Sequence, residues 1–239
     1  MSAFLYGIGL QWKLDFRSKG ILLTYYIIPL IFFLFMGGIF TSIDPNAYKA
    51  LIQSMTVFGV TMGAIIGTPT SLVEFYNSDI RKAYRVGGVP LWTGAVNNFI
   101  SGLIHLSIMS IILFFIAQIV FNASVPSNLV HYFVALELFI LTSLSVGAIL
   151  GLFVKSTSKL TMVSQLVFLP SIMLSGIMFP VDMLPNFMQM IGKVLPATWG
   201  YLNLSADKWE MMSMFPFILT ILIALLLCIW RLGRIHTTE

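Results

Sequence analysis

The sequence has 239 residues, of which 58% are hydrophobic and only 9% are charged, with a formal net charge of +4. Soluble domains carry about 25% charged residues, so this composition excludes a soluble protein and indicates one that lies in a lipid bilayer. The single cysteine, Cys228, excludes a disulfide framework or a cysteine-based metal site within the chain. The positive charge does not indicate nucleic-acid binding, because lysines and arginines are scattered near the ends of apolar runs, as membrane topology requires.

Residues 1–20 predict an amphipathic helix that lies on the membrane surface before the first span. Apolar side chains recur there at helical spacing, whereas Lys13 and Arg17 lie off that face. The alternative is an ordinary cytosolic tail. The apolar face consists of Leu5, Ile8, Trp12 and Phe16.

Six stretches are long and apolar enough to cross a bilayer, which takes about 20 residues of helix. The predicted fold class is therefore an all-α integral membrane protein, with the whole chain, 1–239, as one transmembrane domain. The six predicted spans are 21–40, 50–73, 93–121, 130–154, 160–179 and 211–230.

The distribution of basic residues predicts the orientation. An even number of spans puts both termini on the same side of the membrane. Of the 13 lysines and arginines, all but Lys49, Lys193 and Lys208 would then share the side of the termini. Because basic residues are enriched in cytoplasmic loops, we expect both termini to be cytoplasmic. As a separate expectation, the membrane is the plasma membrane of a bacterium.

Small residues at four-residue spacing predict close helix packing within the membrane. Without bulky side chains, two helix backbones can approach each other closely. Within lipid the hydrophobic effect does not drive helices together, so van der Waals packing holds them instead. Such ridges indicate packing and no particular function. The first ridge is Gly59, Gly63 and Gly67, and the second is Ser143, Gly147 and Gly151.

Two stripes of uncharged polar residues follow one helix face each. Such stripes can line a pathway for an amphipathic cargo. The alternative is that the hydroxyl groups bond to their own helix or to a neighbouring helix. On the second span the stripe is Gln53, Thr56, Gly63, Gly67 and Thr70, and on the fifth it is Thr161, Ser164, Phe168, Ser171 and Ser175.

Two ionisable residues fall inside predicted spans, where such residues are functional hypotheses by default. His105 lies roughly 18 Å into the third span, and Glu137 roughly 10 Å from the outer end of the fourth. We therefore expect them at different depths and not directly paired. His105 is predicted as a packing histidine, and Glu137 as a hydrogen-bond acceptor that orients a helix or as a proton-titrating site.

The loop 74–92 is the largest predicted cytoplasmic connection. Asp79 can cap a short helix through 83–85, and Gly87 and Gly88 can end it before Pro90. A short, capped, basic helix suits docking into a soluble partner, although a plain topology-setting loop is the alternative. Its charged and aromatic surface consists of Arg81, Lys82, Arg85 and Tyr84.

The segment 180–210 is apolar but broken by prolines, so it cannot cross the bilayer as one helix. We predict that it lies at the outer membrane face or dips into it as re-entrant helices. Asp182 and Pro185 mark the expected start of a short helix, and Pro196 its expected end.

No catalytic motif is present in the sequence. The motif G-x-x-x-x-G-K-[ST] is absent, and the one Gly-Lys pair, Gly192 and Lys193, is followed by Val194. The chain therefore cannot bind ATP as a P-loop protein does, and we predict that it is not an enzyme and holds no cofactor of its own.

These features together resemble the type-2 ABC transporter permease family, the membrane subunits of ATP-binding-cassette exporters. The resemblance rests on the N-terminal helix before six spans and on Glu74 with the run 80–85, IRKAYR. The most specific parts are 174–185, LSGIMFPVDMLP, and 195–199, LPATW, with Ile191 between them. One departure is Gly87-Gly88-Val89-Pro90, where relatives more often place a small residue and a proline directly before the next helix.

The resemblance implies a mechanism. Two permeases, as a homodimer or a heterodimer, would pair so that spans two and five line a central path. Two cytosolic ABC ATPase subunits, which carry the ATP and Mg²⁺, would drive export of a drug, antibiotic peptide or lipid. The residues implied for coupling to the ATPase are Glu74, Asp79, Arg81, Lys82, Tyr84 and Arg85, and those for an extracellular gate are Phe179, Pro180, Asp182, Pro185, Phe187 and Pro196.

Two other functions remain open on the sequence. A proton-coupled secondary transporter would use Glu137, although the chain shows no clear inverted repeat. A non-transporting membrane subunit for immunity or sensing is the third alternative.

Overall fold

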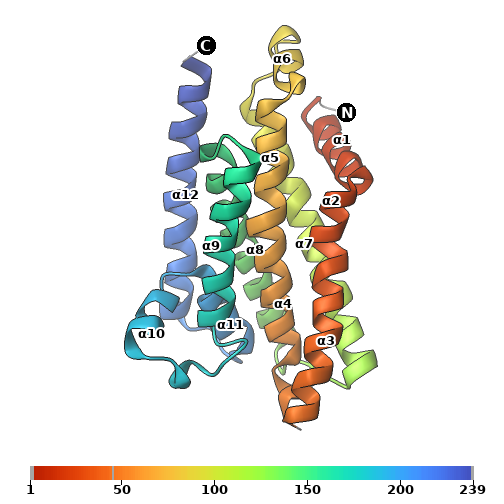
Figure 1. Cartoon of the computed structure of the whole chain (residues 1–239), viewed down its shortest axis with the longest axis vertical. Coiled ribbons are helices and arrows are strands. Elements are labelled where there is room, and N and C mark those ends of the chain that lie inside the picture. The colour runs from red at the N-terminus through yellow and green to blue at the C-terminus, as the bar shows by residue number, and fades with distance from the viewer. Residues whose placement is uncertain (1–2, 45, 238–239) are drawn as a thin grey trace.

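The protein is an elongated helical bundle in the computed structural model, which describes residues 3–44 and 46–237 and the side chains of 5–44, 46–84 and 86–234 (Figure 1). These residues form no β-strand. Six helices are long and apolar enough to cross a membrane. The all-α, six-span fold class predicted from the sequence is thus confirmed.

The first two spans are composite, and the other four are single helices. The first comprises α2 (Lys19–Leu22), η1 (Leu23–Ile27) and α3 (Ile28–Ile43), and the second α4 (Leu51–Met62), η3 (Gly63–Gly67) and α5 (Thr68–Asn77). The third to fifth spans are α7 (Trp92–Phe121), α8 (Leu129–Phe153) and α9 (Thr157–Leu174), and the sixth lies within α12 (Met211–Thr237). The connecting elements are α1 (Ala3–Arg17), η2 (Ala47–Lys49), α6 (Asp79–Val86), η4 (Val181–Met183), α10 (Asn186–Gly192) and α11 (Pro196–Ser205).

The fifth span is shorter than predicted. Its helix ends at Leu174, not at residue 179, because Gly176 takes a left-handed conformation with φ +93°. Glycine adopts this conformation at little cost, so it ends a helix that hydropathy alone would extend.

Two turns of π-helix, η1 and η3, interrupt the first two spans before a proline. Pro29 and Pro69 each lie at the start of the next α-helix and have no backbone N–H to donate. The residues before them bond five positions back instead, Ile28 to Leu23 and Thr68 to Gly63. Tyr25 of η1 and Thr68, the residue directly after η3, share a hydrogen bond of 2.7 Å between Oη and Oγ1. Such turns are frequent at functional sites.

The second span is the centre of the bundle. All residues of α4 are buried, between α7 on one side and α8 on another. A Cβ added at Gly63 would lie 2.4 Å from Leu106 of α7, and one at Gly147 of α8 would lie 2.0 Å from the carbonyl oxygen of Ala64. The second ridge therefore brings α8 into backbone contact with the second span, whereas the first ridge packs against side chains of α7 and of the first span.

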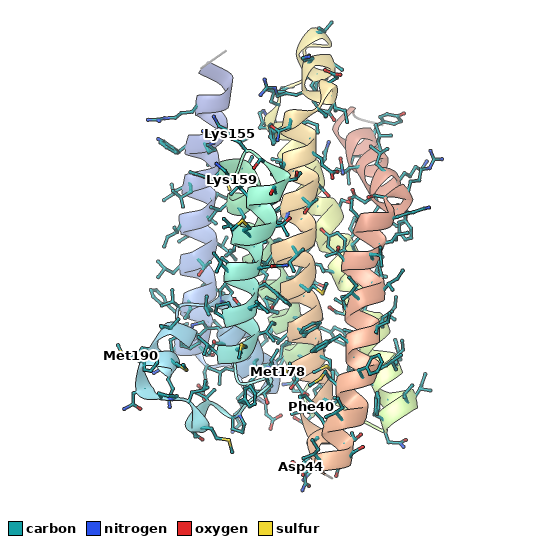
Figure 2. The ribbon with its side chains drawn as sticks, in the orientation of Figure 1. Phe40, Asp44, Lys155, Lys159, Met178 and Met190 are labelled. Carbon is teal, nitrogen blue, oxygen red and sulfur yellow. The ribbon has the colours of Figure 1, made fainter. Side chains whose placement is uncertain are left out.

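The two ends of the bundle differ. Both termini and α6 lie at one end, here called the terminal end, whereas α10 and α11 lie at the opposite end (Figure 1). Lys155 and Lys159 lie towards the terminal end, and Asp44, Met178 and Met190 towards the opposite end (Figure 2). Having the termini at one end agrees with an even number of spans.

Candidate functional site

The short helix predicted in the loop 74–92 is formed, as α6, at the terminal end (Figure 1). Its cap differs from the prediction. Ser78, not Asp79, precedes the helix, and its Oγ accepts a hydrogen bond of 3.3 Å from the backbone N–H of Ile80. Asp79 is the first helical residue, where a carboxylate favours the positive end of the helix dipole.

The end of α6 follows the prediction. Gly88 is left-handed, with φ +67°, and the N–H of Val89 bonds to the carbonyl of Tyr84 at 2.8 Å. This six-residue closure is the Schellman arrangement that glycine permits. The helix is thus fixed at both ends and keeps its shape on the surface without a partner.

The surface of α6 combines charges with an anchored aromatic ring. Lys82 pairs with Asp79 at 2.9 Å, and both side chains are exposed. Tyr84 packs edge-on against Phe75 of α5, with ring centroids 5.1 Å apart. A displacement of α6 would therefore reach the end of the second span through this ring pair. The side chain of Arg85 lies outside the described part of the chain.

The stripe predicted on the second span faces other helices of the same chain over most of its length. Thr56 is buried and lies 3.0 Å from Tyr132 Oη of α8. Gln53 is buried as well. At Gly67 an added Cβ would lie 3.3 Å from the ring of Tyr25. Only Thr70 is partly exposed, so this residue alone of the five reaches the surface of the chain in this conformation.

The stripe predicted on the fifth span is divided between interior and surface. Ser164, Ser171 and Ser175 are buried, and the last two donate to carbonyls of their own helix, Val167 and Ile172. Phe168 is partly buried and packs against Phe58 of α4. Thr161 is exposed, and its hydroxyl donates to Thr157 at 3.0 Å.

The surface of α9 has a polar residue that the sequence analysis missed. Gln165 is exposed, two helical turns after Thr157, and follows Thr161 on the same face. Its amide makes no hydrogen bond to any described residue. The signal was visible in the sequence as a glutamine inside an apolar run, but only the structure shows that it points away from the bundle.

The segment at the opposite end forms three short elements, η4, α10 and α11. The predicted start of a helix near Asp182 and Pro185 is confirmed, since η4 and α10 begin there. The predicted end at Pro196 is wrong, because α10 ends at Gly192 and Pro196 is the first residue of α11. Proline is favoured at that position because the first helical N–H needs no partner.

Side-chain bonds to backbone groups hold α11 to the end of α10. Thr198 donates to the carbonyl of Gly192, and Trp199 Nε1 to that of Lys193, both at 2.7 Å. A Cβ at Gly200 would lie 2.6 Å from the ring of Phe139, so α11 packs tightly on α8. The gate residues predicted here, Phe179, Pro180, Asp182, Pro185 and Phe187, are exposed, and Pro196 is partly buried.

His105 is a buried packing histidine with one bonded nitrogen. Its Nδ1 lies 2.7 Å from Tyr26 Oη, and Trp12, Phe16 and Tyr25 surround the ring. Nε2 has no partner among the described residues. The predicted role is therefore supported, with aromatic groups from α1 and the first span as its neighbours.

Glu137 is joined to the third span. Ser107 Oγ lies 2.9 and 3.2 Å from its two carboxylate oxygens. Glu137 and His105 are not paired, as expected, but the predicted difference in depth is too large, because Ser107 is only two residues from His105. Counting residues from the helix ends neglects helix tilt and side-chain reach.

The N-terminal helix α1 packs on α7 through a polar contact that the sequence analysis did not find. Asp15 is only 3% exposed and accepts hydrogen bonds from Ser101 Oγ at 2.5 Å and Gln11 Nε2 at 2.8 Å. Burial raises the pKa of Asp15, and the two hydrogen bonds partly offset that rise. On the predicted apolar face, Leu5 and Phe16 are exposed, whereas Ile8 and Trp12 are half-buried.

A bundle of six apolar spans, with a capped surface helix at one end and a folded, apolar segment at the other, defines a multi-pass membrane protein. The family model of the ABC-2 type transporter matches residues 4–206, and the chain belongs to that family. No curated protein matches the chain. The resemblance drawn from the sequence is thus confirmed.

Membership gives the coarse function. The chain is a permease subunit of an ABC-type transporter, a membrane component that generally works with ATPase subunits. The matched range includes α1, all of α6 and the segment through α11.

Proposed function

We propose that this permease exports a hydrophobic or amphipathic compound, driven by ATP hydrolysis on two separate cytosolic subunits. The observation that carries the proposal is α6, a capped helix with exposed charges at the terminal end, in a chain without a P-loop motif. A membrane component of this kind needs an external motor, and α6 is a rigid element onto which a motor could dock. ATP and Mg²⁺ would be held by that partner.

The second part of the proposal is pairing with another permease through α9. An exposed amide inside a membrane span is costly against lipid, because nothing there can hydrogen-bond to it. Gln165 and Thr161 form such a polar surface on α9. A second copy, or a related permease, would cover this surface or enclose it in a water-filled path.

The orientation and the gate follow from the same arrangement. With the basic terminal end in the cytoplasm of a bacterial cell, η4, α10 and α11 would lie at the outer face. Their exposed apolar side chains, including Met183, Phe187 and Met190, suit a surface that contacts lipid, cargo or a second permease. Methionine side chains adapt to many apolar shapes, which fits a gate for a varied cargo.

Transport in inverted membrane vesicles tests the proposal. The permease and its ATPase subunits are expected to co-purify, and uptake of cargo should require hydrolysable ATP. Uptake that persists with a hydrolysis-deficient ATPase, or that follows an imposed proton gradient without ATP, would contradict it.

The docking role of α6 has a sharper test. Reversing charge at Arg81 and Arg85 should abolish ATP-driven transport and reduce ATPase co-purification at least about tenfold, while expression is retained. Lys155→Glu, at an exposed lysine of the same end that lies between α8 and α9, is the control and should transport normally. Normal coupling of the double variant would refute the docking role.

A further inference from the structure

A pocket of about 120 Å³ opens at the terminal end, between the start of the first span and the end of the second. One wall comes from the turn before α2 and from η1, and the other from η3 and α5. Ile21 is buried at its base. The polar or small residues that line it are Ser18, Gly20, Thr24, Gly67, Thr70 and Glu74.

Two hydroxyl groups of the pocket, those of Thr24 and Thr70, already donate their protons within their own helices. Thr24 Oγ1 donates its proton to the carbonyl of Gly20 at 2.9 Å, and Thr70 Oγ1 donates to that of Ile66 at 2.8 Å. Since a hydroxyl has one proton and two lone pairs, what remains on both oxygens can only accept. Ser18 caps α2, with its Oγ accepting from the N–H of Ile21 at 3.4 Å.

Glu74 completes the pocket with a carboxylate that has no partner among the described residues. Lys82 of α6 is paired with Asp79 instead. An ionised carboxylate accepts hydrogen bonds and cannot donate them. The pocket therefore presents negative charge and oxygen acceptors, which favours a cation with N–H groups and disfavours an anion.

We propose that this pocket binds a primary ammonium group, with Glu74 as its counter-ion and Thr24 and Thr70 as hydrogen-bond acceptors. A primary ammonium has three donors that match these acceptors, whereas a quaternary ammonium has none. A volume of about 120 Å³ equals roughly four water molecules of liquid, so the ammonium and its first methylene groups fit. A longer alkyl tail remains outside, next to the apolar spans.

The position of the pocket connects the ligand with the coupling helix. Glu74 lies on the last helical turn of α5, which is followed directly by α6. The resemblance assigned Glu74 to coupling and Thr70 to the pathway, and the pocket brings the two together. The inference rests on the proposed function in one respect, because in an exporter the bound ammonium identifies the cargo as an amine-bearing amphipath. The amine of a lipid headgroup offers the same chemistry.

Binding to the permease without its ATPase tests the site. The full-length chain is placed in nanodiscs of phosphatidylcholine and phosphatidylglycerol, and a dansylated alkyl primary amine is titrated by fluorescence polarisation, with empty nanodiscs as the blank. We expect saturable binding that is at least about tenfold tighter than that of the trimethylammonium analogue. Equal binding of both probes, or none beyond the blank, would overturn the proposal.

Two variants locate the binding. Glu74→Gln should weaken binding of the primary amine by about tenfold or more, as loss of a charge-assisted contact requires. Gly20→Leu should block the pocket without removing charge, since a Cβ at Gly20 meets only Ser18 Oγ, at 4.0 Å. Glu210→Gln makes the same chemical change at an exposed carboxylate outside the pocket and should leave binding unchanged. Wild-type affinity in both pocket variants would refute the assignment.

A last comparison separates the two sources of the amine. Replacing phosphatidylcholine by phosphatidylethanolamine should compete with the probe if the pocket holds a lipid headgroup, and should leave its affinity unchanged if the pocket selects a cargo. Both results require the same ammonium site. Failure of probe binding would leave ATP-driven export intact as a hypothesis, because the vesicle experiment measures export separately.

Discussion

The second span lies inside the bundle, whereas the sixth lies at its surface. In the most apolar part of the second span 94% of the residues are buried within the chain, and in that of the sixth only 11% are. Yet the second is the less apolar of the two. Lipid demands apolar side chains all round, whereas a central helix can carry glycine, serine and threonine because its neighbours satisfy them. Of these two spans, the more polar one is therefore the one that the chain buries.

The fifth span departs from this relation. It is the least apolar of the six, yet only 28% of its apolar part is buried. By the pattern of the second span, a helix of this polarity should be central. The mismatch is removed if α9 is central in an assembly larger than one chain, as the proposed pairing requires.

The largest effect is expected at the contact between the second span and α8. Gly147→Ala places a Cβ 2.0 Å from the carbonyl oxygen of Ala64, and a backbone atom cannot move aside as a side chain can. We expect a loss of roughly 1–3 kcal/mol or failure to fold. Thermal unfolding in detergent measures it. Gly38→Ala on α3, where a Cβ meets nothing within 4 Å, is the control and should be neutral.

Cross-linking tests whether α9 is central in the assembly. In a Cys228→Ser background, Gln165→Cys should give a mostly cross-linked dimer with a short bismaleimide in membranes. Leu226→Cys, on the exposed surface of α12, should remain monomeric under the same conditions. Equal cross-linking at both positions would contradict the proposal that α9, and not α12, lies at the contact between two permeases.

The contact of α1 with α7 should depend on pH through Asp15. Burial raises its pKa above the ordinary value near 3.8, so the folded chain binds this proton more tightly than the unfolded chain. Its contribution to stability is full below the ordinary pKa and is lost as pH rises through the raised value. The slope has a ceiling of about 1.4 kcal/mol per pH unit.

Asp15→Asn isolates that contribution. The variant should lose this part of the pH dependence and unfold at a higher temperature than the wild type at neutral pH, because no charge is then buried. Thermal unfolding across pH 4–8 gives the measurement, with Asp207→Asn, an exposed acid, as the control. A pH profile identical to that of the wild type would show that Asp15 ionises without cost.

The smallest effect is expected at Glu137. In Glu137→Gln the amide oxygen still accepts from Ser107, and interhelical hydrogen bonds in membranes average only about 0.6 kcal/mol. ATP-driven export should therefore be nearly unchanged. A strong shift in the pH dependence of transport would instead favour the proton-coupled alternative, in which Glu137 titrates during the cycle.

The sequence predicted the positions of the helices better than the contacts between them. Hydropathy located all six spans, and Gly87 and Gly88 marked the end of α6, because both signals are local. The cap at Ser78 was missed because a serine and an aspartate next to each other are both good N-cap residues. The start of α11 at Pro196 was missed because a proline can mark either the end of one helix or the first residue of the next. Pro29 and Pro69 were local signals for the two π-helical turns, because each proline lacks the N–H that an α-helix would use.

Three properties could be read from the sequence alone: six membrane spans, two termini at the same end of the bundle, and the family. They depend on apolar length, the even number of spans and short motifs, which are properties of the chain itself. Only the tertiary structure decided which faces are covered. It buried Thr56 against Tyr132 and Asp15 against Ser101, left Gln165 exposed, and joined Thr24, Thr70 and Glu74 in one pocket. The physical reason is that a helical period defines a face, whereas its environment depends on helices far away in the sequence.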